Sequence, residues 1–337
     1  MKTLERELGT LTFAANQTST LQLPRNYAFR RLSLKLDAQL TIAAGASAGD
    51  PKDSSPAQLI RNITIRANGR DVIKSIDFET LHRLTQWRHG VRPRMLALPA
   101  GYGAQTNYVC ECCALLDFEM WRAIRPIDTL LDSAGLATLE LIITWGAPND
   151  VMNAAYVAAG VSIGTGGATL TVSSIESVGV PVGTKFMVNK EYQIRSQVSA
   201  ASNNHQIILP TGNLYRTIIL KTHSDGNQVN TILSNIQIVS GTEVFKNRNA
   251  AALQRDNRVD FGLEIPEIRG SGAAKDHYLL EYVMDGYYIL EFCGDGHLTE
   301  ALDTTRLSEL KLVLDVAHPG TTDIVDVYPC ELIMPAA

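Results

Sequence analysis

The sequence is short of the residues that cross-link a chain, stack on ligands or bind polyanions. Its 337 residues include five cysteines without regular spacing, so we predict reduced thiols in a cytosolically made protein and no disulfide framework. Charged residues make up 19% of the chain and the formal net charge is −5, which argues against a nucleic-acid-binding protein. Apolar residues make up 45%, enough for the two hydrophobic cores expected of a chain this long.

The sequence also lacks clear apolar runs typical of a secretory signal peptide or a transmembrane helix. The first residues, "MKTLERELGTLTF", carry charges where a secretory signal needs an apolar core, so we expect no secretion. The sequons at Asn16 and Asn62 are therefore not predicted to carry glycans. Residues 151–175 contain no charge and are long enough to span a bilayer. They are rich in Gly, Ala, Ser and Thr, however, which favours a flexible or β-structured connection.

Motifs that carry chemistry are absent as well. The chain has no G-x-S-x-G, no P-loop and no His-x-His pair of the kind that a bicupin metal site uses. Cys110, Cys112 and Cys113 could suggest zinc, but no C-x-x-C or His-x-x-x-His accompanies them. On a strand, Cys110 and Cys112 share one face and Cys113 points away, so we interpret them as small hydrophobes. We predict no catalytic, cofactor-binding or metal-binding residue, and no enzyme.

Two charge patterns allow a functional interpretation. Asp315, Asp323 and Asp326 could hold a calcium ion at the rim of a β-sandwich, with solvated surface acids as the alternative that we favour. A basic stretch has eight Arg or Lys against three acids, and its functional interpretation is a patch facing anionic lipid or an acidic neighbouring subunit. The alternative is ordinary solvated strand and helix faces. The basic residues are Arg61, Arg66, Arg70, Lys74, Arg83, Arg88, Arg92 and Arg94.

What the chain does contain is an internal repeat. Four blocks recur in the same order, with offsets that drift from 186 to 171 residues. Four blocks in one order indicate two copies of one fold. The pairs are 23–36 with 209–222, 59–74 with 232–246, "ETLHRL" with "AALQRD", and 130–148 with 301–319.

Asn62 belongs to the second of these blocks. It pairs with Asn235, but Gln237 replaces the Thr64 of its sequon. The asparagine is therefore predicted to hold local backbone at the start of a hairpin, where such side chains commonly bond the main chain.

Each copy is predicted to be mostly β. Leu32, Leu34 and Leu36 alternate with polar residues, as in a strand with one buried face. Asn68-Gly69 supplies the two positive-φ residues of a type I′ hairpin turn, and Ser240-Gly241 is predicted to take its place in the second copy. "LELIITW" and "LKLVLDV" are also predicted as strands. A helix follows each hairpin, first as "FETLHRLTQW", with apolar residues at three-residue spacing, and then as "NAAALQRDNRV".

We therefore predict an all-β fold of two tandem jelly rolls, antiparallel β-sandwiches that each have a short helix in a connecting loop. The domains are predicted as residues 1–150 for the first jelly roll, 151–185 for a linker or insertion, and 186–337 for the second jelly roll. A parallel α/β sheet would need a helix between most strands, and the sequence does not supply them.

This arrangement resembles the double jelly-roll major capsid proteins of the tectivirus-, corticovirus- and adenovirus-like lineage, and the length suits its smaller bacteriophage members. The resemblance implies a structural protein, synthesised in the host cytoplasm and located in the virion. It also implies a homotrimer that forms a pseudo-hexagonal tile of an icosahedral shell. Expected partners are neighbouring capsomers, penton and minor capsid proteins and an internal lipid membrane, with no sequence-specific nucleic acid. The N-terminal segment, with Lys2 and Arg6, is expected at the inner pole.

Two other functions remain open at this point. A glycan-binding protein with two sandwiches would need exposed aromatic platforms, yet only 7% of the residues are aromatic. The three tryptophans of this chain, Trp87, Trp121 and Trp145, all lie in the first copy. A hydrolase with two jelly rolls would need acids clustered near one rim.

Overall fold

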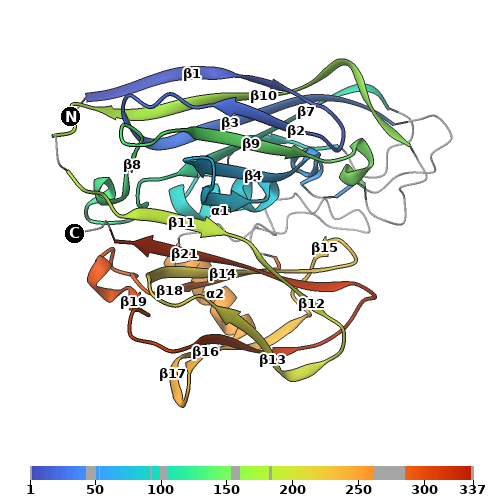
Figure 1. Ribbon diagram of the computed structural model, residues 1–337. Helices are drawn as coiled ribbons and strands as arrows, with labels where there is room; N and C mark the ends of the chain where they lie inside the picture. Colours follow the sequence, from blue (N-terminus) through green and yellow to red (C-terminus); the bar gives the residue numbers. More distant parts are fainter. Residues whose placement is uncertain are drawn as a thin grey trace.

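The computed structural model describes residues 2–42, 51–52, 54–91, 93–98, 105–152, 160–181, 184–261 and 285–334. Within these ranges the chain forms two β-sandwich units, one above the other in Figure 1, each with a helix beside its sheets.

The first unit consists of two facing sheets of four principal strands. One sheet has the order β1-β10-β3-β7 and the other has the order β2-β9-β4-β5. The strands span Lys2–Thr12 (β1), Thr18–Gln22 (β2), Ala28–Ile42 (β3), Ile60–Ala67 (β4), Asp71–Ile76 (β5), Gln105–Asp117 (β7), Leu139–Trp145 (β9) and Val161–Val178 (β10).

The second unit repeats this topology strand for strand. Its sheets have the orders β12-β21-β14-β18 and β13-β20-β16-β17. The predicted pair of tandem jelly rolls is confirmed. The strands span Ile194–Val198 (β12), Ser202–Leu209 (β13), Leu214–Ser224 (β14), Leu233–Ser240 (β16), Glu243–Asn249 (β17), Tyr287–Glu291 (β18), Leu310–Val316 (β20) and Asp323–Ile333 (β21).

Short strands complete the sheets. β6 pairs with β7, β8 with β3, β15 and β19 with β14, and β11 with β21. Their bounds are Met95–Leu96 (β6), Leu131–Asp132 (β8), Val188–Tyr192 (β11), Asn227–Gln228 (β15) and Leu302–Asp303 (β19).

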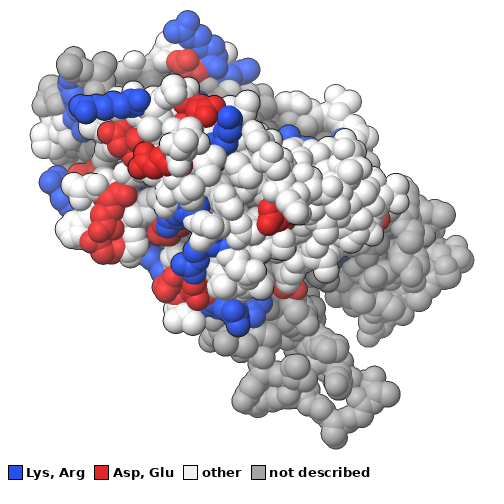
Figure 2. Space-filling model, turned by 90° about the horizontal axis from the view of Figure 1, so that it is seen from below, with Lys and Arg blue, Asp and Glu red and all other residues white. Residues whose placement is uncertain are grey.

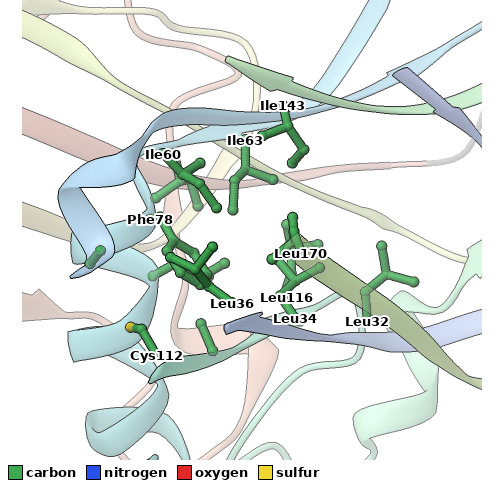
Figure 3. Close-up of a cluster of buried hydrophobic side chains, with 14 of the residues drawn as sticks. Leu32, Leu34, Leu36, Ile60, Ile63, Phe78, Cys112, Leu116, Ile143 and Leu170 are labelled. Carbon is green, nitrogen blue, oxygen red and sulfur yellow. The ribbon is translucent and has the colours of Figure 1, made fainter. Parts of the chain in front are cut away.

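The core of the first unit lies between its two sheets. β3 buries every second residue, and Leu32, Leu34 and Leu36 are fully buried as predicted. They face Ile63 of β4 and Ile143 of β9 across the sandwich (Figure 3). The alternation follows from the period of two along a strand, which sends successive side chains to opposite faces.

The two hairpins differ slightly from the prediction. Asn68 and Gly69 both have positive φ, at 53° and 72°, but the loop between the paired residues Ala67 and Asp71 also contains Arg70. In the second unit Ser240 is still paired with Glu243, so the two-residue turn is Gly241-Thr242 and not Ser240-Gly241. Gly241 retains the positive φ, at 56°, that glycine adopts without steric cost.

A helix follows each hairpin, as predicted. α1 spans Phe78–His89 and α2 spans Ala250–Asp260. Each begins with the same kind of cap, because Asp77 accepts a hydrogen bond from the Thr80 N–H at 2.8 Å and Asn249 accepts one from the Ala252 N–H at 3.1 Å. The predicted apolar face of α1 is buried; its residues are Phe78, Leu81, Leu84 and Trp87.

The segment predicted as a linker is part of the first unit. Residues 161–178 form β10, which pairs with both β1 and β3 in the middle of a sheet. β10 is the counterpart of β21, the last strand of the second unit, so the connection between the units starts after Val178. Small residues suffice here because β10 is held by backbone hydrogen bonds on both sides. Residues 153–159, 182 and 183 of the predicted linker lie outside the described residues.

The N-terminal segment is also a strand of the first sheet. Residues 2–12 form β1, and Arg6 binds Glu176 of β10 with 2.8 Å between Nη2 and Oε2. Of the helices in the described ranges, none has both the length and the apolar character needed to cross a membrane.

Candidate functional site: the joint between the two units

The strand β11 joins the two units into one continuous sheet. It pairs antiparallel with β21 of its own unit. On its other edge it pairs parallel with β5, with Glu191 opposite Lys74 and Tyr192 opposite Ser75. Figure 1 shows β11 between the upper and the lower unit. The joint is therefore built from backbone as well as side chains, and it uses the outer edge of β5, which would otherwise be exposed.

Glu191 binds two cations of the first unit at this joint. Its Oε2 lies 2.9 Å from Lys74 Nζ, and its Oε1 accepts from the guanidinium of Arg88. The three side chains are at most 3% exposed. Burial alone raises the pKa of Glu191, but the charges of Arg88 and Lys74 outweigh it and lower the pKa to about 2. The carboxylate thus stays ionised inside the protein.

A second ionic cluster lies at the N-terminal end of α1. Lys221 of β14 reaches across the joint to Asp77 at 3.3 Å and Glu79 at 2.8 Å. Burial lowers the pKa of Lys221, but the two carboxylates raise it well above its usual value. The Tyr328 hydroxyl donates to Asp77, so the helix cap of the first unit is also a contact with the second.

An aromatic cluster lies beside Arg88 at the joint. The indoles of Trp87 and Trp121 meet edge to face with centroids 4.2 Å apart, and Phe261 meets Trp87 at 5.0 Å. The guanidinium of Arg216, from β14, lies 3.8 Å from the Trp121 ring centroid. Such cation–π contacts strengthen when they are desolvated, and Arg216 is 1% exposed.

A polar cavity of about 350 Å³ lies at the joint. Lys52 and Arg61 of the first unit and Gln193, Arg195 and Gln228 of the second line it, among others. A space of this size holds several waters, at roughly 30 Å³ each, and charged side chains from both units reach it.

The acids considered for calcium are held by the chain's own side chains and backbone. Asp323 accepts from His318 Nδ1 at 2.6 Å and from the Gly320 N–H at 3.0 Å. Asp326 binds Arg195 at 2.8 Å and His223 at 3.0 Å. Both aspartates are fully buried, so the prediction of solvated surface acids is wrong for them.

Asp315 lies apart from this pair, half-buried on β20. The described residues include no group of three or more His, Cys, Asp or Glu arranged to hold a metal ion.

The basic stretch does not form a patch. Lys74, Arg83 and Arg88 are buried, which contradicts both interpretations of them, an exposed patch and solvated faces. The others that the structure describes extend outward but are bound by acids of the same chain, and Arg92 lies outside the described residues. The pairs are Arg61 with Asp150, Arg66 with Glu140, Arg70 with Asp71, and Arg94 with Glu111.

The three neighbouring cysteines are packed residues of strand β7. Cys110 and Cys112 are fully buried on the core face of β7 and Cys113 is half-buried on the other face, as the strand pattern predicted.

The prediction that the Asn62 side chain bonds local backbone is wrong. Its amide donates instead to the hydroxyls of Thr64 at 3.0 Å and Ser75 at 3.1 Å, the latter across the hairpin.

The joint itself was missed by sequence reasoning. Glu191 and its partners Lys74 and Arg88 lie more than 100 positions apart in the chain, and no motif relates them. A lone charged residue inside an apolar run, such as Lys221 in "TIILKTH", indicates that a charge is buried. The sequence does not indicate which residue pairs with it.

The fold defines a class, the double jelly-roll proteins. No family model and no curated protein matches the sequence. Solved structures do match in fold.

A chain of the Sulfolobus Turreted Icosahedral Virus structure has TM-score 0.73 and 16% identity, with 99% of this chain and 92% of that chain covered. The major capsid protein P2 of bacteriophage PM2 has TM-score 0.61 and 13% identity, with 99% and 98% covered. A chain of the PBCV-1 virus capsid has TM-score 0.62 and 10% identity, with 100% and 97% covered. At these identities the likeness is one of fold.

Proposed function

We propose that this protein is the major capsid protein of an icosahedral virus. The observation that carries the proposal is the extent of the likeness. The chain was compared with proteins from three viral particles, and the similarity covers both jelly rolls and the joint between them. In each comparison at least 99% of this chain and at least 92% of the other chain are covered. A single β-sandwich shared with a larger protein would support no such proposal, because sandwiches host many functions.

The joint supports a mechanical role. Buried ion pairs that span two units are costly to separate, because separation leaves charges without partners. The two sandwiches are thus held in one relative orientation, as a tile of a regular shell requires. We propose that the protein acts as a structural subunit without catalysis, and that three copies form a homotrimeric, pseudo-hexagonal capsomer.

The remaining partners follow from this role. We place the protein in the virion after synthesis in the host cytoplasm, in contact with neighbouring capsomers. Penton proteins, minor capsid proteins and an internal lipid membrane are further proposed partners, and a bacteriophage is the proposed source.

Light scattering coupled to gel filtration tests this function. We expect a species of three times the chain mass of 36.8 kDa, and electron microscopy of concentrated material should show pseudo-hexagonal arrays or shells. A monomer at all concentrations that binds a sugar would instead support the glycan-binding alternative. The structure offers that alternative little surface, since the tryptophans Trp87, Trp121 and Trp145 are at most 5% exposed.

A further inference from the structure

The two strand edges that meet in the joint each have a counterpart elsewhere in the molecule. The first is β11. Val188 lies 186 residues after Lys2, the same offset that relates Leu23 to Leu209. The registers agree as well, because Lys2 pairs with Val178 of β10 as Val188 pairs with Ile333 of β21.

The interruptions of these strands also coincide. β1 has a bulge after Glu7, and Gln193, its counterpart 186 residues later, separates β11 from β12. β11 and β12 together therefore correspond to β1, and Glu191 corresponds to Glu5.

The second edge is β5, whose counterpart is β17. Ile65 pairs with Lys74 immediately before a bulge in the first hairpin. Ile238 pairs with Lys246 immediately before a bulge in the second. Lys246 therefore corresponds to Lys74, so the acid and the base of the internal joint each have a counterpart of the same residue type.

Both counterpart strands end their sheets. β1 is terminal in the order β1-β10-β3-β7, and β17 is terminal in the order β13-β20-β16-β17. They lie on opposite sides of the molecule, β1 at the top and β17 at the bottom of Figure 1. Edge strands with unpaired backbone groups are templates for pairing with another chain.

We propose that β17 of one copy pairs in parallel with β1 of the next copy, with Lys246 opposite Glu5 and Asn247 opposite Arg6. This contact repeats between chains the one that β5 and β11 make within a chain. It rests on the proposed function, in which copies of the chain assemble into a closed capsomer. Two opposite, non-identical edges form a head-to-tail contact, which closes into a ring when the rotation allows. Three chains then contribute six sandwiches in one ring.

The side chains at the two edges suit this contact. Glu5 is exposed and its carboxylate has no partner among the described residues. Lys246 is half-buried; its Nζ donates to the carbonyl of Glu291 and lies 4.8 Å from the ring centroid of Phe292. An ammonium has three donors, so Lys246 retains donors for a carboxylate.

The surrounding surface makes this pair important for register. The face seen from below, on the side of β17, carries Lys and Arg intermingled with Asp and Glu beside a broad uncharged area (Figure 2). This face therefore does not present charge of a single sign to a neighbouring copy. Backbone pairing and the one charge pair have to align the two strands.

The copy of the internal joint lacks one of the two cations that bind Glu191. Arg88, the second cation that binds Glu191, lies eleven residues after Asp77, the N-cap of α1. The residue eleven positions after Asn249, the N-cap of α2, is Asp260. The contact between chains thus has one cation instead of two. We expect it to be weaker than the internal joint, as suits a contact that forms after each chain has folded.

Charge reversal tests the proposal in the full chain. Glu5→Lys and Lys246→Glu should each raise the trimer dissociation constant at least tenfold by light scattering, and the double reversal should restore most of the affinity. Glu300→Lys and Arg306→Glu are matched controls at exposed positions in the described structure, and should leave the trimer unchanged. A wild-type trimer that both reversals leave intact overturns the strand pairing alone. A wild-type monomer overturns the proposed function and the pairing with it.

Cross-linking tests the same contact without relying on charge. A variant with Glu5→Cys and Lys246→Cys, which lie directly opposite each other on one face of the sheet in the proposed register, is treated with a short bismaleimide. It should give covalent trimers on a denaturing gel, whereas each single variant should not. Circular dichroism and urea unfolding establish that the variants are folded. A folded trimer that cross-links no more in the double variant than in the singles contradicts the pairing.

Discussion

The strands β5 and β17 occupy the same place in the two units and differ in what covers them. Lys74 of β5 is fully buried under β11, whereas Lys246 of β17 is half-buried. The helices differ in the same way. Trp87 of α1 is buried in the joint, and Val259, at the same distance from the cap of α2, is 78% exposed. One fold thus presents a covered face in one unit and an open face in the other.

This difference teaches what the joint contributes. The topology and the register of the hairpin are the same in both units, so they do not depend on the neighbouring unit. The burial of charge does depend on it. Glu79, which binds Lys221 across the joint, has Ala251 at its place in the second unit.

The largest effect is expected from removing the charge of Glu191. Glu191→Gln leaves Lys74 buried without its counter-charge and leaves Arg88 with Asp117 alone, at 4.0 Å. Removing one partner of a buried ion pair typically costs about 3–5 kcal/mol of unfolding free energy. Urea unfolding measures this cost. Glu5→Gln, at the corresponding exposed position, should cost the dissociated chain less than about 0.5 kcal/mol. Equal costs at the two positions would show that the joint does not hold the units together.

The next effect concerns the two cores. Ile63 and Ile236 are corresponding, fully buried residues of β4 and β16, and replacing either by alanine should cost about 2–5 kcal/mol. Because the joint couples the units, we expect each variant to lower one common unfolding transition, followed by tryptophan fluorescence and circular dichroism. Two separate transitions in the wild-type chain would contradict this coupling.

A smaller, graded effect is expected on acidification. The pKa values of Glu79 and Glu191 are lowered in the folded chain from 4.5 to about 2, since cations at the joint outweigh the effect of burial. Their contribution to stability is therefore complete above about pH 4.5 and is lost as the pH falls toward 2. Unfolding midpoints in urea at several pH values should fall over this window. Glu191→Gln should flatten the decline, and a wild-type midpoint that stays constant between pH 4.5 and 2.5 would contradict the assignment.

The smallest effect is expected at the asparagines of the two hairpins. Asn62 is half-buried and its amide binds Thr64 and Ser75, so Asn62→Ala should cost about 1 kcal/mol. Asn235 donates to Asn247 at 3.0 Å in an exposed bond, so Asn235→Ala should cost less than about 0.5 kcal/mol. Thermal unfolding of the two variants checks the order, and a larger loss at Asn235 would reverse the comparison.

Local patterns predicted the parts of the fold that depend on nearby residues. The alternation of Leu32, Leu34 and Leu36 predicted β3, the glycines predicted both hairpin turns to within a residue, and the spacing from Phe78 to Trp87 predicted α1. The repeat then predicted the same elements in the second unit. Residues 161–178 were missed as a central strand because their small side chains give little hydrophobic signal, while neighbouring strands supply their hydrogen bonds.

By itself the sequence determined that one β-rich unit occurs twice, because alternation, turns and caps are set within a few residues of the chain. Only the tertiary structure decided which charges are buried and which strand edges remain open. Glu191 meets Lys74 and Arg88 from positions far along the chain, and their pairing depends on how the two units dock. The same docking covers β5 and leaves β1 and β17, the counterparts of β11 and β5, at the ends of their sheets, because a chain with two units makes this contact only once.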